Sequence, residues 1–351
     1  MAEVKLGKDA ITLPVGTEAG RPANPVTGMI RWNTDTDALE GYNGVEWAPI
    51  SSVPISATGG TVSDVTIDGV DYRIHEFTST GTSSFEVISL GTTNGEMDVL
   101  VVAGGGGTGY NGTGGGGSGG VVFVSGHTAA PSNHTVTVGN GGNNNPNTSD
   151  GSFGTNGDDS SVFGFTALGG GTAGLKDLSD GSGRDGGSGG GAGRDYSFAA
   201  GGSALQPGEN PSADNDAGND GGAQLISSAS IGAGGGGAGE PAPDADGDCR
   251  DQSGGLVALG RGGDGLDFSS IFTTNYGDNG FFGGGGGGGA WSGCSNVGAG
   301  GAGGGGHGGN EGNGFAPEPG QNNTGGGGGG AGNDESGSTG GSGIVLIRYR
   351  I

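Results

Sequence analysis

The sequence predicts an all-β protein that contains a bundle of polyproline-II helices made of glycine, and three observations lead to this prediction. Glycine supplies 96 of the 351 residues, whereas its average usage is about 7%. Most glycines lie after residue 103, in consecutive runs. Short segments rich in β-branched residues separate these runs, and some adjoin a run directly, as at Ala103–Gly104 and Gly120–Val121. A chain of this composition cannot build an ordinary side-chain core throughout, so its backbone must supply much of the cohesion.

Two other states of a glycine-rich chain fit the sequence less well. Gly/Ser tracts are by default flexible linkers, and ordering each residue costs about 1–2 kcal/mol of backbone entropy. The strand-like segments between the runs argue against disorder. Collagen needs glycine at every third position and much proline, whereas here glycines are consecutive and prolines number 13. The runs that define the pattern are Gly104–Gly107, Gly114–Gly117, Gly234–Gly237, Gly283–Gly289, Gly303–Gly306 and Gly325–Gly330.

An ordered bundle would use the geometry of polyproline II. This helix has three residues per turn and no internal hydrogen bonds, so its N–H and C=O groups point outward. Helices without Cβ atoms can approach closely and bond backbone to backbone. Each such bond contributes only about 0.5–1.5 kcal/mol net, so the lattice has to be extensive to offset the entropy of ordering.

Residues 1–55 are predicted to form a small β-meander. Met29–Trp32 and Ala38–Tyr42 read as strands joined by a turn, and Asn43–Gly44 is a tight-turn pair before a short strand that ends at Trp47. So small a sheet has only marginal stability when it is isolated in water. We therefore expect it to pack against copies of itself or a docking partner through apolar side chains, with Ile30, Trp32, Tyr42 and Trp47 as the candidates. Residues 56–61 are predicted to be a linker.

Residues 62–351 are predicted to form one glycine-rich domain. Its base, residues 62–103 and 343–351, is expected to be a short β-sandwich, in which Asp98–Val102 is a buried strand because its apolar run is continuous. The last strand, Gly343–Tyr349, is expected to return and pair with the early ones. Residues 104–342 are expected to form the polyglycine region, a glycine-rich sandwich with long loops. Further strands are predicted at Tyr72–Phe77, Ser84–Leu90, Gly120–Val124, His134–Val138 and Ser161–Thr166.

Composition limits the classes of partner. The formal net charge is −25 with only 12 Lys and Arg residues, which argues against nucleic acid because phosphate contacts need clusters of basic side chains. The start, Met1–Pro14, contains no apolar stretch typical of a secretory signal. The longest strongly apolar stretches, such as Val99–Ala103 and Ile344–Ile347, are too short to span a bilayer. We therefore expect a soluble protein that is made in the cytosol.

No constellation of catalytic residues stands out, so no enzymatic activity and no cofactor is expected. Glycine-rich segments invite a phosphate-loop interpretation, but the sequence lacks the G-x-x-x-x-G-K-[ST] pattern. The acidic stretch with Asp244, Asp246 and Asp248 suits calcium, which prefers oxygen ligands, or is a solvated acidic loop. Cys249 and Cys294 are either two free thiols or one disulfide that joins distal loops after release into an oxidising medium.

Aromatic residues are concentrated in the stretches between the glycine runs. Aromatic faces beside Asp and Asn suit sugars or exposed protein loops, so these residues are candidates for a binding surface. The alternative is that the rings fill gaps beside the glycine lattice, which we favour for Phe281 and Phe282 because they lead directly into Gly283. The candidates for binding are Tyr196, Phe198, Phe268, Tyr276, Trp291 and Phe315.

Several of these segments resemble a known family. Phe77–Gly81, Asp98–Gly107, Gly115–Val124, His134–Gly139 and Gly343–Tyr349 are together similar to the glycine-rich domain of phage tail-fibre and adhesin proteins. The segment Gly28–Trp47 separately resembles a short module of structural and tail-fibre proteins of tailed phages. In T-even-like phages a similar adhesin sits at the fibre tip, where a sandwich of polyglycine helices displays variable loops that bind bacterial receptors.

The resemblance implies a function that composition alone does not. It predicts a virion protein, part of a tail fibre or another external appendage, that binds the host through loops on a polyglycine scaffold. Residues 1–55 would dock to fibre or baseplate proteins or form a homotrimer, and the receptor would be a surface glycan or an outer-membrane protein. The main alternative is a capsid-fibre or decoration protein without a receptor role. An ice-binding protein is a further alternative, but it would require a flat, regular Thr/Ala face, which long irregular loops do not supply.

Overall fold

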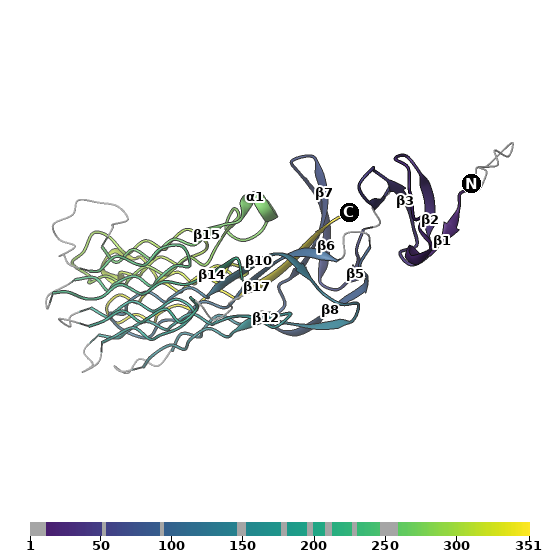
Figure 1. Cartoon of the computed structure of the whole chain (residues 1–351). Coiled ribbons are helices and arrows are strands. Elements are labelled where there is room, and N and C mark those ends of the chain that lie inside the picture. The colour runs from purple at the N-terminus through teal and green to yellow at the C-terminus, as the bar shows by residue number, and fades with distance from the viewer. Residues whose placement is uncertain are drawn as a thin grey trace.

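The structure, a computed structural model, describes residues 12–50, 54–91, 95–145, 152–176, 181–194, 199–207, 213–226, 230–245 and 259–351. These residues form β-sheets and a large bundle of extended glycine-rich segments, and the predicted all-β class is confirmed. Figure 1 shows the bundle reaching away from the sheets, which lie nearer the N-terminal end of the chain. Among the described residues no helix has the length and apolar character needed to span a membrane.

The N-terminal residues form a four-stranded sheet in the order β1-β2-β3-β4. The two predicted strands of the hairpin are present, and β2 and β3 pair antiparallel. A third strand, β4, pairs with β3 after the turn at Asn43–Gly44, but it begins at Trp47, where the predicted strand ends. Two elements were not predicted: β1, which pairs parallel with β2, and the short 3₁₀ helix Glu18–Gly20 that follows it. The strands are β1 Val15–Gly16, β2 Ile30–Asn33, β3 Ala38–Tyr42 and β4 Trp47–Pro49.

Two larger sheets pack face to face and form the predicted β-sandwich. The six-stranded sheet has the order β14-β10-β9-β17-β7-β6, and the five-stranded sheet has the order β13-β12-β11-β8-β5. The first consists of β6 Thr61–Ile67, β7 Val70–Phe77, β9 Glu96–Val102, β10 Val121–Thr128, β14 Asn215–Ala217 and β17 Ile344–Arg350. The second consists of β5 Ser56–Thr58, β8 Gly81–Ser89, β11 Asn133–Val138, β12 Ser160–Val162 and β13 Phe165–Ala167.

Two details of the sandwich bear on the sequence predictions. The C-terminal strand β17 lies between β7 and β9 and pairs with both, as expected. The predicted linker 56–61 is wrong, because Ser56–Thr58 is strand β5 and pairs with β8. The flanking Pro54 and Gly59–Gly60 end the strand but do not prevent it, since Gly59 and Gly60 take the positive φ values of turns.

The six-stranded sheet is covered by apolar side chains on both faces, which explains the continuous apolar run of β9. Side chains alternate between the two faces of a strand. Val99 and Val101 pack against the five-stranded sheet. Leu100 and Val102 pack on the other side, against a segment that contains β15 Leu266–Asp267, α1 Ser269–Phe272 and β16 Phe281–Phe282. A strand buried on both faces has no solvent side on which polar residues would alternate.

The glycine-rich segments form polyproline-II helices, as the repeat of their hydrogen bonds shows. In residues 114–120 every third N–H donates to the same neighbouring segment. Gly114, Gly117 and Gly120 donate to residues 174, 171 and 168, whereas Gly115 and Ser118 donate to residues 233 and 236. Donors that return to one neighbour after three residues require a helix with three residues per turn. The falling and the rising acceptor numbers show that the first neighbour is antiparallel and the second parallel.

Segment 284–290 is fully surrounded by other segments of the same kind. Its N–H groups donate to three neighbours, and its carbonyls accept from three more. The acceptor segments are 303–309, 260–263 and 113–116, and the donor segments are 298–301, 327–330 and 232–235. Six neighbours around one helix make a hexagonal lattice held by backbone hydrogen bonds, which confirms the predicted mode of cohesion.

The lattice excludes side chains at its centre. A Cβ atom placed on Gly286 would lie 2.0 Å from the carbonyl oxygen of Gly328, and one on Gly116 would lie 2.1 Å from that of Gly106. Real Cβ atoms do not approach oxygen so closely, and the obstructing atoms are backbone that is itself hydrogen-bonded on other sides. Consecutive glycines are therefore a steric requirement of the packing.

Gly286→Ala is expected to lower the free energy of unfolding by about 3 kcal/mol or more, because the added methyl group overlaps a lattice carbonyl that cannot move aside. Denaturant titration followed by circular dichroism measures this loss. Gly314→Ala is the matched control: nothing lies within 4 Å of its Cβ position and only its φ of +73° is unfavourable, so it should cost about 1 kcal/mol. Equal costs for the two variants would contradict the steric explanation.

The sandwich core contains one buried histidine. His75 on β7 is fully buried, its Nδ1 lies 2.7 Å from the Gly59 carbonyl oxygen, and its Nε2 lies 2.9 Å from the Tyr349 hydroxyl. Because a carbonyl only accepts, Nδ1 carries the proton and Nε2 accepts from Tyr349. Burial lowers the pKa of His75 from its ordinary value, so the folded protein holds a neutral imidazole.

Acidification is therefore expected to destabilise the fold through His75. The unfolded chain takes up a proton near pH 6.5 while the folded chain does not, so this contribution is complete above that pH and is lost as pH falls below it. His75→Gln removes the titration, so the stability difference between wild type and this variant should be smaller at pH 5 than at pH 8 in urea titrations. An unchanged difference would mean that His75 does not titrate in this way, and His134→Gln serves as a partly exposed control.

Candidate functional site

The first candidate surface lies at the end of the bundle where the helices reverse direction, away from the sheets (Figure 1). Two exposed aromatic residues lie in its turns. Trp291 follows directly after segment 284–290 and is 39% exposed, and Phe315 follows segment 303–309 and is 51% exposed. Both are candidates from the sequence, and both lie where they can contact a partner.

The lattice holds these two turns together. The Ala290 N–H donates to the Gly309 carbonyl, and the side-chain amide of Asn310 donates to the Cys294 carbonyl at 2.9 Å. The ring of Trp291 lies over Gly293, where even a Cβ atom would clash with it. The aromatic face is therefore carried by a turn with little freedom, and such preorganisation lowers the entropy cost of binding.

The charge around Phe315 is negative. Glu311, Asp334 and Glu335 belong to this turn or to the next one, and the Glu335 carboxyl accepts from the Gly332 N–H. Burial, with a smaller effect of Glu311, raises the pKa of Glu335 above its ordinary value. An aromatic ring beside carboxylates that accept hydrogen bonds suits a ligand that carries hydroxyl or N–H donors.

Two of the predicted binding aromatics are core residues, so their predicted exposure is wrong. Phe268 is 4% and Tyr276 is 9% exposed, and both pack with Phe123 and Leu346 on the outer face of the six-stranded sheet. The Tyr276 hydroxyl hydrogen-bonds to Ser63 at 2.6 Å. They are buried because β9, β10 and β17 present apolar side chains on that face, and the segment with α1 covers them. Phe282 belongs to the same cluster, as expected for a gap-filling ring.

The remaining predicted residues belong to an acidic stretch, a cysteine pair and an aromatic pair, and the structure describes only some of them. Five lie outside the described residues, and their roles stay predictions: Tyr196, Phe198, Asp246, Asp248 and Cys249. Asp244 is described, and its carboxylate accepts from the Ala223 N–H. Cys294 is disulfide-bonded and buried. Within the described residues, no three His, Cys, Asp or Glu side chains are grouped so that they could hold a metal ion.

A second candidate surface is an apolar face of the N-terminal sheet. Val15, Trp32 and Leu39 lie opposite one another across β1, β2 and β3, so they share one face. Ile30 lies on the same face, and the Ile50 side chain packs against Gly41 there. Val15, Ile30, Trp32 and Ile50 are 66%, 44%, 37% and 50% exposed. An uncovered row of large apolar side chains is typical of an interface, and we call these five residues the apolar face.

The predicted docking residues do not all share this face. Tyr42 and Trp47 pair with each other on the opposite side, with ring centroids 5.7 Å apart, and the Arg31 guanidinium lies 5.9 Å from the Trp47 ring. The four predicted residues therefore form two pairs on opposite faces, Ile30 with Trp32 and Tyr42 with Trp47. Tyr42 is three positions from Leu39 along β3, and side chains an odd number of positions apart point to opposite faces of a strand. Val15 and Ile50 were missed, since neither belongs to a strand that the sequence pattern predicts.

The opposite side of the sheet buries a charged network. The carboxylate of Glu40 accepts from Arg21 at 2.7 Å and from the Asn33 amide at 3.0 Å, and it lies 3.4 Å from Nε of Arg31. The Arg31 and Glu40 side chains are 5% and 4% exposed. The hydrogen bond from Arg21, opposed by burial, lowers the pKa of Glu40 below its ordinary range, so the carboxylate is charged at neutral pH.

A family model described as a glycine-rich domain matches residues 78–350. No curated protein is significantly similar to the chain.

Glu40→Ala is expected to destabilise the N-terminal sheet by about 3–5 kcal/mol, because it leaves the buried Arg31 without its counter-charge. Tryptophan fluorescence during denaturation reports this loss, since Trp32 and Trp47 both belong to this sheet. Glu46→Ala, an exposed change in the neighbouring turn, should stay within about 0.5 kcal/mol of wild type. The effect should also be pH-dependent, because the contribution of Glu40 is lost as pH falls through its lowered pKa. Identical unfolding transitions for Glu40→Ala and Glu46→Ala would contradict the proposal that the charged network stabilises this sheet.

Proposed function

The chain belongs to the glycine-rich domain family, and from this membership together with the geometry above we propose that it is an adhesin of a phage tail fibre. In this proposal the polyglycine lattice is a rigid support, and its distal turns contact the surface of a bacterial host. The mechanism is binding, with no chemical step. The observation that carries the proposal is the pair of exposed aromatic residues, Trp291 and Phe315, on adjoining turns that the lattice fixes.

The lattice supports this proposal because it separates stability from recognition. Cohesion comes from backbone bonds between glycine segments, such as 113–120 and 284–290. Turns between such segments can differ in length and sequence while the support stays the same, which is what a receptor-binding surface requires.

The N-terminal sheet supplies the other end of the proposed assembly. Its apolar face would bind a fibre or baseplate protein or pack against further copies of the chain in a homotrimer. Several copies on one virion would bind multivalently, so that weak contacts at each tip sum to a high avidity. The proposed location is the virion exterior, and the proposed receptor is a bacterial surface glycan or an outer-membrane protein.

The purified protein is expected to compete with phage for adsorption to the host, and Trp291→Ala with Phe315→Ala should weaken this competition at least tenfold. Loss of anchoring aromatic side chains typically costs about 1–3 kcal/mol, which corresponds to such factors. Plaque counts after pre-incubation with increasing protein give the inhibitory concentration of each variant.

Ile88→Ala is the matched control for this experiment, because Ile88 is 54% exposed but lies on β8 in the sandwich. It should compete as well as wild type. Undiminished adsorption at saturating wild-type protein would contradict the adhesin proposal and favour a structural role, which immunogold labelling of virions would then locate.

A further inference from the structure

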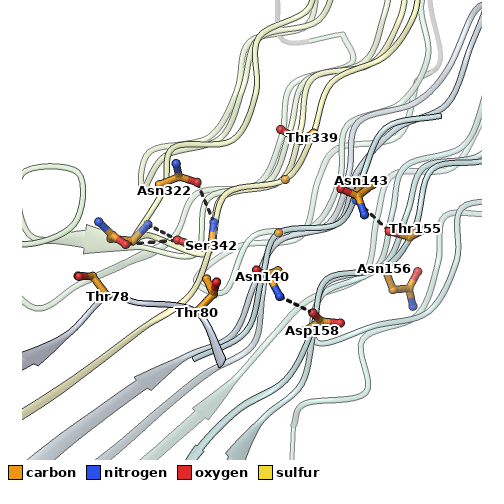
Figure 2. Close-up of a pocket in the computed structure, with 13 residues that line it drawn as sticks. Thr78, Thr80, Asn140, Asn143, Thr155, Asn156, Asp158, Asn322, Thr339 and Ser342 are labelled. Atoms are coloured by element: carbon orange, nitrogen blue, oxygen red, sulfur yellow. Dashed lines mark hydrogen bonds between the residues drawn. The ribbon is translucent and has the colours of Figure 1, made fainter. Parts of the chain in front are cut away.

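A polar trough runs along the flank of the bundle, close to the sandwich and away from the distal turns. Figure 2 shows its lining, which rises from neighbouring glycine-rich segments. The cavity has a volume of about 650 Å³, within the range of about 300–1,000 Å³ for small-molecule sites. None of the aromatic or acidic residues that were predicted to bind a ligand lies in it.

The trough is built from pairs of polar residues spaced three apart. Asn140 and Asn143 lie on one segment, Thr155 and Asp158 on the second, and Thr339 and Ser342 on the third. Since polyproline II has three residues per turn, each pair points to the same side, with about 9 Å between its members.

Backbone bonds place the three segments side by side. Asp158 N–H donates to the Asn140 carbonyl and Thr155 N–H to the Asn143 carbonyl, which makes the first two segments antiparallel. Gly340 N–H donates to the Gly142 carbonyl, so the third segment lies against the first. The polar side chains therefore form a regular array, which the lattice spacing fixes.

Neighbouring side chains hold one another in place. The Asn140 amide donates to the Asp158 carboxylate at 3.0 Å, and the Thr155 hydroxyl accepts from the Asn143 backbone N–H at 2.9 Å. The Ser342 hydroxyl lies 3.3 Å from the Asn323 amide oxygen. Side chains that are already ordered lose little entropy when they bind a ligand.

The chemistry of the lining favours a neutral ligand rich in hydroxyl groups. Within the described residues, the hydroxyls of Thr80 and Thr339 and the side-chain amide of Asn143 make no hydrogen bond, so donors and acceptors both face the trough. Lys, Arg and aromatic residues are absent from the lining that the structure describes, and Asp158 is its one carboxylate. An anionic ligand would meet that carboxylate without a compensating cation, and an apolar ligand would leave amides and hydroxyls unpaired.

We propose that this trough binds a neutral oligosaccharide. The inference rests on the proposed adhesin function, for which it names both a ligand class and a second contact surface on the flank of the bundle. The sugar hydroxyls would donate to and accept from Asn143, Thr339 and Thr80, and the array of paired residues would follow successive sugar units.

Affinity electrophoresis of the full-length chain tests this proposal. The gels contain dextran, a neutral mannan, a neutral galactan or the anionic polysaccharide alginate. We expect at least one neutral polysaccharide to retard wild type, and Asn143→Ala with Thr339→Val to weaken that retardation at least tenfold. Both substitutions remove only atoms without a partner among the described residues, and the backbone bonds of both positions remain. Ile88→Ala, an exposed change on β8 outside both candidate surfaces, is the matched control and should be retarded like wild type.

Three outcomes would overturn the trough proposal: no retardation by any neutral polysaccharide, retardation by alginate alone, or equal retardation of wild type and the trough variant. The adsorption assay separates this failure from failure of the adhesin proposal. Wild-type protein that blocks adsorption but binds no neutral polysaccharide overturns only the trough. Protein that binds a neutral polysaccharide through Asn143 and Thr339 but never blocks adsorption overturns only the adhesin.

Discussion

The structure depends on one steric fact, which is that glycine has no Cβ atom. Helices such as 284–290 can therefore approach until carbonyl oxygens occupy the space that side chains would fill, as at Gly286. At that distance each helix bonds to six neighbours through its backbone alone. Each bond stabilises the fold only slightly, but the bonds are many, and every N–H of segment 284–290 has a partner in another segment. Together these bonds offset the large entropy cost of ordering glycine.

The sandwich fixes one end of the lattice. β9, β10, β11 and β17 lead directly into or out of glycine-rich segments, so the sheet fixes the relative positions of segments far apart in sequence. The side-chain core on both faces of the six-stranded sheet is thus continuous with a core made of backbone. The two modes of packing meet around Phe282 and Ala238, where a ring covers the sheet and Gly283 begins a lattice segment.

The strands and the polyglycine packing could be predicted from the sequence because both are local in origin. Apolar runs such as Val99–Val102 mark strands, and consecutive glycines permit only a few ordered structures. Burial of Phe268 and Tyr276 could not be predicted, since it depends on which face of β9 and β17 is left uncovered, and that follows from tertiary pairing. The split between Trp32 and Tyr42 depends on strand register for the same reason. The sequence does contain a pattern that indicates the trough, namely polar residues spaced three apart, as in Asn140/Asn143 and Thr339/Ser342. This spacing places two side chains on one side of a segment only if the segment is a helix with three residues per turn.

A core without side chains also limits where such a protein can recognise anything. Ordinary domains line deep pockets with apolar side chains from their interior, but the interior of this bundle is mostly backbone, and its described apolar side chains form only small buried clusters such as that of Ile231, Ala290 and Val297. Recognition must therefore use either the turns at the ends of the segments or the outermost rows of side chains along the flank. The end places single large residues, such as Trp291 and Phe315, on fixed turns. The flank can only present shallow, repetitive arrays of small polar residues, such as that around Asn143. The two candidate surfaces differ in chemistry because the same lattice exposes different kinds of position at its end and at its side.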